Sequence, residues 1–564
     1  MTQINDLRAH VVRAEAARDH QSAARALMQI EALGAATPAD LLRCALHHLL
    51  ADELEQADAS LRRAMSAGAP PAGALAVAAQ IAIKSAAWAR LWEISRKRLE
   101  LTPNDDQARE HLSRSLLEQG DLDAAAEAFA PLMQSGAPVS PARALIFGQI
   151  CLHTQRFDEA KTHLEFAASA DPNSARARVG LARLATFEGR LADAEALCRE
   201  AALIEPNDPR PLQQLAVIQR GSVDKNTTSV LQRLYSETNL PLADRAGVGF
   251  SLGDIAFRAG EAETALKFYS ESNALRRDFF AEQGFDYTPI KAKARFERLS
   301  DAYDALGKPP PLTDDAPRPV FVIGPPRSGT TLIESILARH PDVAAHGEVS
   351  AGPRVLDAFE RRLDAEAGVS APKIVERHAV EWRRGYSAAT FDTTDKSFTA
   401  HTDKMPGNGL AAPLLMRLFP AARFIVCRRT PFDVAVSIFR HQFPGAYDWA
   451  HRLEDIANFL ERHERLIAQL AASHSDRFAV IDYDALVAAP DEGRRTIVSA
   501  AGLTWDAACD EANADGRRIA TFSSVQARKP ISRSASDGGS LFRPLMEKFA
   551  TELDDRIAKA RSLA

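Results

Sequence analysis

The residues with the clearest chemical signature are Gly324 to Thr331, which read GPPRSGTT. They follow an apolar run, Val320 to Ile323, and precede a helical one, Leu332 to Leu337. Backbone N–H groups in a turn between a strand and a helix form a cradle for an anion, with the positive end of the helix dipole behind them. We therefore predict a phosphate-binding loop here, with Arg327 as its cation.

This loop differs from the loop of nucleoside triphosphatases. Their pattern, G-x-x-x-x-G-K-[ST], places a lysine after the second glycine, where it reaches the β and γ phosphates. Here Gly324 and Gly329 keep the spacing, but Thr330 stands at the lysine position and the cation lies inside the turn. The displaced cation favours a different phosphate donor.

A second candidate anion site follows another apolar run. Phe424 to Cys427 is strand-like, and Thr430 with Asp433 three residues later predicts a capped helix after it. Arg429 leaves the strand, and Ser437 lies about two turns into the helix. A guanidinium and a hydroxyl placed in this way can hold one phosphate from two sides. Two anion sites on one sheet suit a nucleotide phosphorylated at both its 5′ and 3′ positions.

Short apolar runs precede these motifs and predict the fold that positions them. Runs at 320–323, 423–427 and 478–482 alternate with amphipathic helical segments. This order predicts an α/β domain with a mostly parallel sheet and helices on both faces. Ligands bind such folds at the carboxyl ends of the strands, which is where the motifs lie.

The first half of the chain repeats with a period of about 34 residues. Units 141–174 and 175–208 align without gaps, and each has Pro-Asn near its end, which predicts the end of a helix. Further units fit near 4–37, 38–72, 73–105, 106–140 and 246–279. The pattern resembles tetratricopeptide repeats, which stack into an α-helical solenoid with a concave face. An alanine-rich bundle with an accidental period is the alternative, but three adjacent units keep register.

We predict three segments from these patterns. Residues 1–280 form the helical repeat domain, 281–315 a helical and proline-rich linker, and 316–564 the sheet domain. The groove of the repeats could hold a substrate, a partner protein or a second copy of the chain, so a homodimer is one expected assembly.

Residues 316–564 resemble sulfotransferases that use 3′-phosphoadenosine 5′-phosphosulfate (PAPS). The loop of that family for the 5′-phosphosulfate reads P-[KR]-S-G-T-T, as Pro326 to Thr331 do, and its 3′-phosphate motif has the Arg and Ser spacing of Arg429 and Ser437. Asp482 to Pro490 match a further feature, a strand followed by Y-[ED]-x-L and a proline-ended helix. Helical repeats fused to such a domain resemble a known bacterial arrangement.

The resemblance implies a P-loop-like fold, PAPS as donor, 3′,5′-adenosine bisphosphate (PAP) as product, and no metal. It also implies which residues bind the donor: Arg327, Ser328, Gly329, Thr330, Thr331, Arg429, Ser437 and Tyr483.

Within the family, tyrosylprotein sulfotransferases are the most similar subgroup. They have a Gly-Glu pair after the loop, matched by Gly347-Glu348, in which the glutamate is the catalytic base. Their lysine before a loop proline is matched by Lys404, which together with Arg327 would stabilise the leaving oxygen. Cytosolic small-molecule sulfotransferases instead use the histidine of K-x-H-x-P, and Lys404-Met405-Pro406 has none.

The tail from Thr521 to Ser536 resembles the family's final nucleotide-binding loop less closely. Arg528, Lys529, Arg533 and Arg543 are all candidates, and we favour Lys529 because a proline follows it as in the tyrosylprotein subgroup.

Composition narrows the class of protein. A net charge of −6 without a basic stripe argues against a nucleic-acid partner. No window holds 18 uninterrupted apolar residues, so the sequence predicts no membrane span. The N-terminus lacks the apolar core of a signal peptide, and we therefore expect a cytoplasmic protein. The five cysteines are far apart, which predicts buried thiols. The sequence contains no H-E-x-x-H motif, so we predict no metal site.

Two other functions compete with sulfuryl transfer. An ATP-dependent switch coupled to the repeats would use the Gly324 loop with Asp482, but it lacks the loop lysine. A scaffold with a degenerate catalytic half is the other, and the intact Arg327, Glu348 and Lys404 argue against it. A peptide tyrosine, a sugar hydroxyl and a lipid head group are all open as acceptors.

Overall fold

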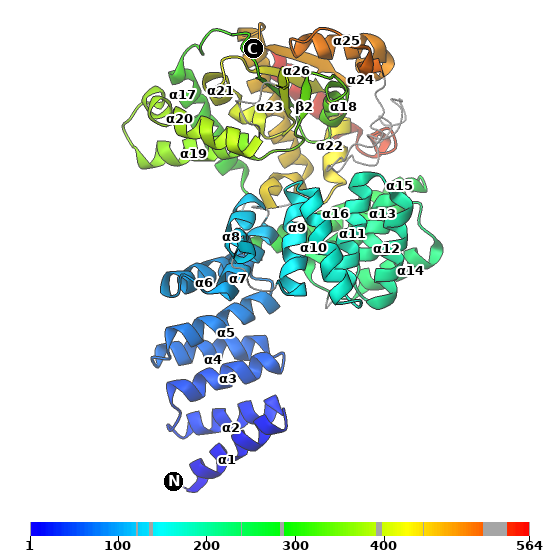
Figure 1. Ribbon diagram of the computed structural model, residues 1–564. Coiled ribbons are helices and arrows are strands. Elements are labelled where there is room, and N and C mark those ends of the chain that lie inside the picture. Colours follow the sequence, from blue (N-terminus) through cyan, green and yellow to red (C-terminus); the bar gives the residue numbers. More distant parts are fainter. Residues whose placement is uncertain are drawn as a thin grey trace. The chain divides into compact units, whose positions relative to one another are not determined.

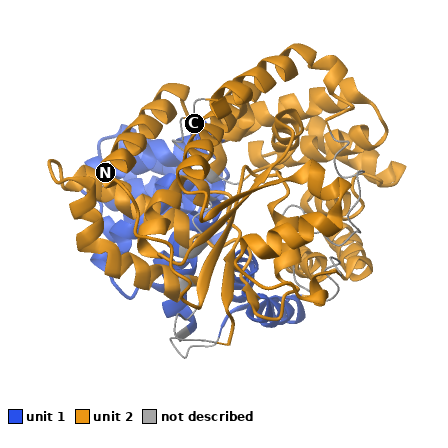
Figure 2. Cartoon of the chain, turned by 90° about the horizontal axis from the view of Figure 1, so that it is seen from above, with its two compact units in different colours: residues 1–171, 280–285, 444–446 blue, residues 172–279, 286–443, 447–564 orange. Residues whose placement is uncertain are grey.

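The computed structural model describes residues 2–119, 122–134, 139–237, 240–282, 287–390, 397–443, 445–510 and 539–562. The chain divides into two compact units, coloured separately in Figure 2. Unit 1 comprises residues 1–171, 280–285 and 444–446, and unit 2 comprises the rest. In the described part of the chain, no helix is long and apolar enough to cross a membrane.

Unit 1 is built from helical hairpins, and Figure 1 shows its first helices stacked one after another. Each repeat predicted in this region corresponds to two helices. The helices are α1 (Thr2–Ala16), α2 (His20–Ala32), α3 (Pro38–Leu50), α4 (Leu54–Ser66), α5 (Pro71–Lys84), α6 (Trp88–Leu101), α7 (Asp106–Gln119), α8 (Leu122–Gln134), α9 (Pro141–His153) and α10 (Phe157–Ala170).

Unit 2 continues the helical pairs. The predicted unit 175–208 forms α11 and α12, and the unit 246–279 forms α15 and α16. α12 ends two residues before Pro206, as the Pro-Asn signal predicts. The helices are α11 (Ala175–Glu188), α12 (Leu191–Ile204), α13 (Arg210–Ile218), α14 (Lys225–Ser236), α15 (Leu242–Arg258), α16 (Ala262–Glu282) and α17 (Pro289–Leu306).

A parallel sheet of five strands follows, in the order β2-β3-β1-β4-β5. The three predicted strands are β1, β4 and β5, while β2 and β3 are short strands that the apolar runs did not predict. All four pairings are parallel. The strands are β1 (Arg318–Ile323), β2 (Val343–Ala345), β3 (Ala400–Asp403), β4 (Arg423–Arg428) and β5 (Phe478–Asp482).

The predicted helices on both faces of the sheet are present. Alternate strand residues point to opposite faces. Phe321, Phe424 and Phe478 are in register on one face, and their rings stack with centroids 5.0 and 4.6 Å apart. That face packs on α17, α19, α20, α21 and α23, and the other packs on α18, α24 and α25. The domain helices are α18 (Thr330–Leu337), α19 (Ala351–Ala365), α20 (Ala371–Thr390), α21 (Asn408–Leu418), α22 (Pro431–Phe439), α23 (Leu453–Ser473), α24 (Tyr483–Ala488), α25 (Pro490–Ala500) and α26 (Glu547–Ser562).

A third core joins repeat helices to the sheet domain. Phe250 of α15 and Tyr269 of α16 belong to one buried cluster with residues of α22, α23 and α26. Three short 3₁₀ segments complete the described structure: η1 (Gly445–His451), η2 (Ala507–Asp510) and η4 (Arg543–Leu545). All five cysteines are buried free thiols, as predicted.

Candidate active site

Each of the five strands is followed by a candidate site residue. The anion loop follows β1, Glu348 lies three residues after β2, and Lys404 comes directly after β3. Arg429 follows β4, and Tyr483 follows β5. Because all five strands are parallel, these residues gather at one edge of the sheet.

The anion loop has a backbone that requires its two glycines. Gly324 has φ 154°, and a Cβ there would lie 2.7 Å from the Cys427 carbonyl oxygen. Gly329 has φ 112°, and a Cβ there would overlap the ring of Tyr483. Arg327, between them, adopts φ 71°, a left-handed conformation that is rare for arginine and clusters at functional sites. Helix α18 begins at Thr330, two residues earlier than predicted, so both threonines lie in its first turn.

The loop contacts the second candidate anion site directly. Arg327 Nε donates to Ser437 Oγ at 3.1 Å, and Arg429 Nη1 lies 3.4 Å from the Arg327 carbonyl oxygen. The Arg429 guanidinium also lies over the Tyr483 ring, 4.9 Å from its centroid. Arg327, Ser437, Arg429 and Tyr483 therefore form one continuous cluster, although the chain separates the first two by 110 positions.

The helix that carries Ser437 begins differently from the prediction. Thr430 occupies the N-cap position of α22, but its side chain makes no capping hydrogen bond. Its hydroxyl instead donates to Asp484 Oδ2 at 2.9 Å, so the predicted capping box with Asp433 is wrong. The bond joins the start of α22 to α24, on which Tyr483 is the first residue.

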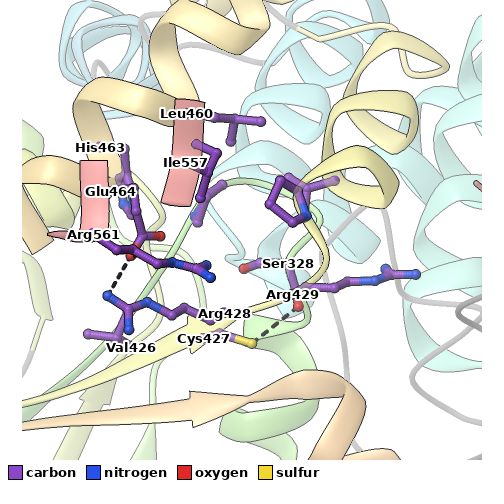
Figure 3. Close-up of a pocket in the computed structure, with 13 residues that line it drawn as sticks. Ser328, Val426, Cys427, Arg428, Arg429, Leu460, His463, Glu464, Ile557 and Arg561 are labelled. Atoms are coloured by element: carbon purple, nitrogen blue, oxygen red, sulfur yellow. Dashed lines mark hydrogen bonds and ion pairs between the residues drawn. The ribbon is translucent and has the colours of Figure 1, made fainter. Parts of the chain in front are cut away.

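Arg428 and Arg429, at the end of β4, point in different directions and contact different groups. Figure 3 shows Arg428 pointing toward Glu464, which it contacts at 2.5 Å, and Arg429 pointing away from it. Arg561 of α26 contacts the same carboxylate at 3.3 Å. Only Arg429 of the two arginines therefore serves the anion cluster.

Glu348 and Lys404 form a hydrogen-bonded ion pair. The Lys404 side chain is fully buried, whereas that of Glu348 is 34% exposed. The backbone fixes the pair as well, because the Lys404 N–H donates to the Gly347 carbonyl oxygen at 2.9 Å. A buried ammonium ion needs such a partner, since an unpaired charge in the interior is strongly destabilising.

Glu334 is a buried acid that the sequence reasoning missed. Its Oε1 accepts hydrogen bonds from the Gly347 N–H at 2.8 Å and from Thr402 Oγ1 at 3.1 Å. These bonds tie the loop helix α18 to the turn before Glu348 and to the strand before Lys404. An acid inside the apolar run 332–337 was the available signal, because buried acids are rare without partners.

Asp403 is a second missed residue, directly before Lys404. Tyr386 donates to Asp403 Oδ2 at 2.6 Å, and both residues are buried. Burial raises the pKa of Asp403 to about 7. The strand that ends at Lys404 is therefore held by a polar contact inside the core.

The anion cluster concentrates positive charge. Burial, together with nearby Arg440 and Arg429, lowers the pKa of Arg327 to about 10, so Arg327 stays protonated at neutral pH. Ser328, Thr330 and Thr331, which were also predicted to bind the donor, lie buried in the loop and the first turn of α18. Lys529, the predicted closing residue, lies outside the described residues.

The chain is similar to known proteins in both its repeats and its sheet domain. Residues 319–507 match the model of the Sulfotransferase family, and residues 152–216 match a Tetratricopeptide repeat model. An uncharacterized protein of Aquifex aeolicus is 26% identical over 63% of this chain and 47% of its own length. A putative protein-tyrosine sulfotransferase of Caenorhabditis briggsae is 25% identical over 33% of this chain and 66% of its own length.

Among solved structures, the sulfotransferase domain of the Synechococcus PCC 7002 olefin synthase aligns with 42% of this chain and 98% of its own. That alignment has 19% identity and a TM-score of 0.29. The matched regions span about half to two thirds of the two curated relatives above. The family models confirm both resemblances seen in the sequence: the chain contains a sulfotransferase-family domain together with tetratricopeptide repeats.

Proposed function

We propose that this protein transfers a sulfuryl group from PAPS to an acceptor hydroxyl. One observation carries the proposal. The arginine-bearing anion loop, the Arg429–Ser437 pair and the Glu348–Lys404 pair lie at the same edge of one parallel sheet. The loop and the arginines suit the phosphates of a donor, and the carboxylate beside them suits the activation of a hydroxyl.

The residues present fit a nucleotide with phosphates at both ends of its ribose. The two loop glycines leave no room for side chains, so the backbone can approach an anion closely. Arg327 with the loop amides would hold the 5′-phosphosulfate, and Arg429 with Ser437 the 3′ phosphate. Tyr483 would lie beside the nucleotide, and Lys529 would close over it. When bound, the donor supplies the sulfuryl group, and the rest of the nucleotide leaves as PAP.

Glu348 and Lys404 have complementary roles in this proposal. The acceptor hydroxyl gives its proton to the Glu348 carboxylate as its oxygen bonds to sulfur. The bond from sulfur to the 5′-phosphate oxygen breaks, and its electron pair stays on that oxygen. Lys404 and Arg327 stabilise the growing negative charge. The ion pair with Lys404 also fixes the position of the Glu348 carboxylate.

A peptide tyrosine is the first acceptor to test, because relatives of this chain include protein-tyrosine sulfotransferases. Sugar and lipid hydroxyls are the alternatives. In this proposal the tetratricopeptide repeats recruit the acceptor or a partner protein, since stacked repeats present an extended binding face. The division into repeats (1–280), linker (281–315) and sheet domain (316–564) stays a prediction.

Transfer of labelled sulfate tests the proposed activity. Purified protein is incubated with ³⁵S-labelled PAPS and either a tyrosine peptide or a host-cell extract, and the labelled product is identified. We expect one PAP for each sulfated acceptor, and product reduced about 10²-fold or more with the Glu348→Gln variant. Absence of any labelled product, with donor intact, contradicts the proposal.

A further inference from the structure

Arg440 links the repeat helices to the helix that carries Ser437. It lies three residues after Ser437, at the C-cap of α22. Its Nε donates to the Tyr269 hydroxyl at 3.2 Å, and its Nη2 contacts Asp254 Oδ1 at 3.4 Å. Tyr269 in turn donates to Asp254 Oδ1 at 2.7 Å. Asp254 belongs to α15 and Tyr269 to α16, so both partners of Arg440 come from the last repeat.

Aromatic rings restrict the position of this guanidinium. The Cζ atom of Arg440 lies 3.5 Å from the centroid of the Phe257 ring, which itself stacks on Phe542 at 5.6 Å. The Arg440 side chain is 15% exposed. Burial opposes its charge, but Tyr269 and Asp254 outweigh burial and raise the pKa of Arg440. The Arg440 side chain is therefore charged and restricted to few conformations.

The same repeat also fixes the backbone at and beyond the end of α22. Asn273 Nδ2 donates to the Phe439 carbonyl oxygen at 2.7 Å, and Arg276 Nη2 donates to the Phe443 carbonyl oxygen at 3.1 Å. The last carbonyls of a helix have no partner within the helix. The Asn273 side chain of α16 supplies a partner for the Phe439 carbonyl oxygen, so the repeat stabilises the end of α22.

Ser437 lies within one turn of Phe439 and Arg440 and bonds to Arg327 of the anion loop. We propose that helices α15 and α16 are positioning elements of the donor site, with Asp254 and Tyr269 holding Arg440 and thereby setting Ser437 against Arg327. The inference rests on the proposed function, because it assigns the cluster to the donor. Arg440 is a positioning residue in this scheme, because it acts through α22. Its charge also lies near Arg327, and Asp254→Asn separates the two effects because it keeps that charge.

The affinity for PAP tests this inference in the full-length protein, by isothermal titration. A misplacement of about 1 Å by a distant mutation can lower a reaction rate about 10²-fold, and we expect a smaller loss of binding affinity from the same cause. We expect about tenfold weaker binding for Arg440→Met and about threefold for Asp254→Asn. Arg440→Lys should recover part of the loss. The double variant Asp254→Asn/Arg440→Met should bind about as Arg440→Met does, because both changes break one network.

Arg277→Met is the matched control. Arg277 is an arginine of α16 and, like Arg440, joins the last repeat to the sheet domain, but it donates to the His451 carbonyl oxygen at 3.0 Å, away from Ser437. It should lower the thermal midpoint and leave PAP affinity within about twofold. Saturating donor should restore most of the turnover of Arg440→Met, so that KM for the donor rises while kcat changes little. General destabilisation of the protein would not change KM alone.

Four outcomes are decisive. Equal PAP affinity in wild type and Arg440→Met overturns the inference, and so does an equal loss in Arg277→Met. If Arg440→Met does not fold, unchanged affinity in Asp254→Asn overturns it. Failure of the wild type to bind PAP contradicts the proposed function itself, which separates the two claims.

Discussion

The two halves of the sheet edge differ in how they present their functional groups. On one side, after β1, β4 and β5, lies a cluster of two arginines and a tyrosine. It is held by a loop whose backbone is strained at Arg327 and by side-chain contacts. On the other side, after β2 and β3, one ion pair joins a partly exposed carboxylate to a buried ammonium. The first arrangement suits binding of an anion, and the second suits movement of a proton. Variants of the two sides should therefore affect affinity and turnover separately.

The largest expected effect is on the proton-transfer side. Glu348→Gln removes the general base while keeping the size of the side chain, so turnover should fall about 10²-fold or more. PAP affinity should change little, because the anion cluster is intact. Turnover is measured with labelled donor and affinity by titration. Unchanged turnover would remove Glu348 from the catalytic role.

Gly329→Ala tests the binding side. The added Cβ would overlap the Tyr483 ring and would adopt φ 112°, so the loop or the tyrosine must shift. We expect PAP affinity to fall about tenfold or more. Gly34→Ala is the control, because Gly34 has φ 69° with open space around it and lies between α2 and α3. Equal affinity in both variants would contradict the role of the loop.

Glu334→Gln sharpens the comparison, since Glu334 contacts both sides. The amide oxygen can still accept both hydrogen bonds but lacks the charge that strengthens the bonds from Gly347 and Thr402. We expect a turnover loss of about threefold to tenfold, in line with roughly 1 kcal/mol for a weakened hydrogen bond. Affinity and turnover should both change in this variant. A change in only one of them would place Glu334 on that side alone.

The smallest effect on activity is expected for Asp403, whose burial should appear as a pH dependence of stability. The folded pKa of Asp403 is about 7, above its ordinary value of 3.8, so the native state holds a proton that the unfolded chain loses. This contribution is full below pH ~4 and is lost as pH rises through ~7. Relative to Asp403→Asn, the wild type should lose thermal stability between those values. Parallel melting curves for the two proteins across this range would contradict the raised pKa.

The sequence predicted those features whose residues are neighbours in the chain, and missed those that depend on distant residues. The anion loop and β1 are contiguous, so an apolar run and two glycines were enough to place them. β3 was missed because Ala400–Asp403 reads as polar although all four residues are buried. Its burial depends on Tyr386 and Glu334, and Thr402 lies 68 positions from Glu334.

The link from repeat to donor site lies beyond any local pattern. Asp254 and Arg440 are 186 positions apart, and each alone reads as an ordinary surface charge. The repeat period predicted α15 and α16 from their small residues, including Gly253, where a Cβ would press on the Tyr269 ring. It could not predict that this pair shares a core with α22, because that core forms only when both segments are folded.

Titration of PAP into the protein without Mg²⁺ tests the central claim most directly. We predict saturable binding that Mg-ATP does not displace, and clearly weaker binding in Arg429→Ala, because Arg429 would lose its grip on the 3′ phosphate. A preference for Mg-ATP over PAP, or equal PAP affinity in Arg429→Ala and wild type, would contradict the account.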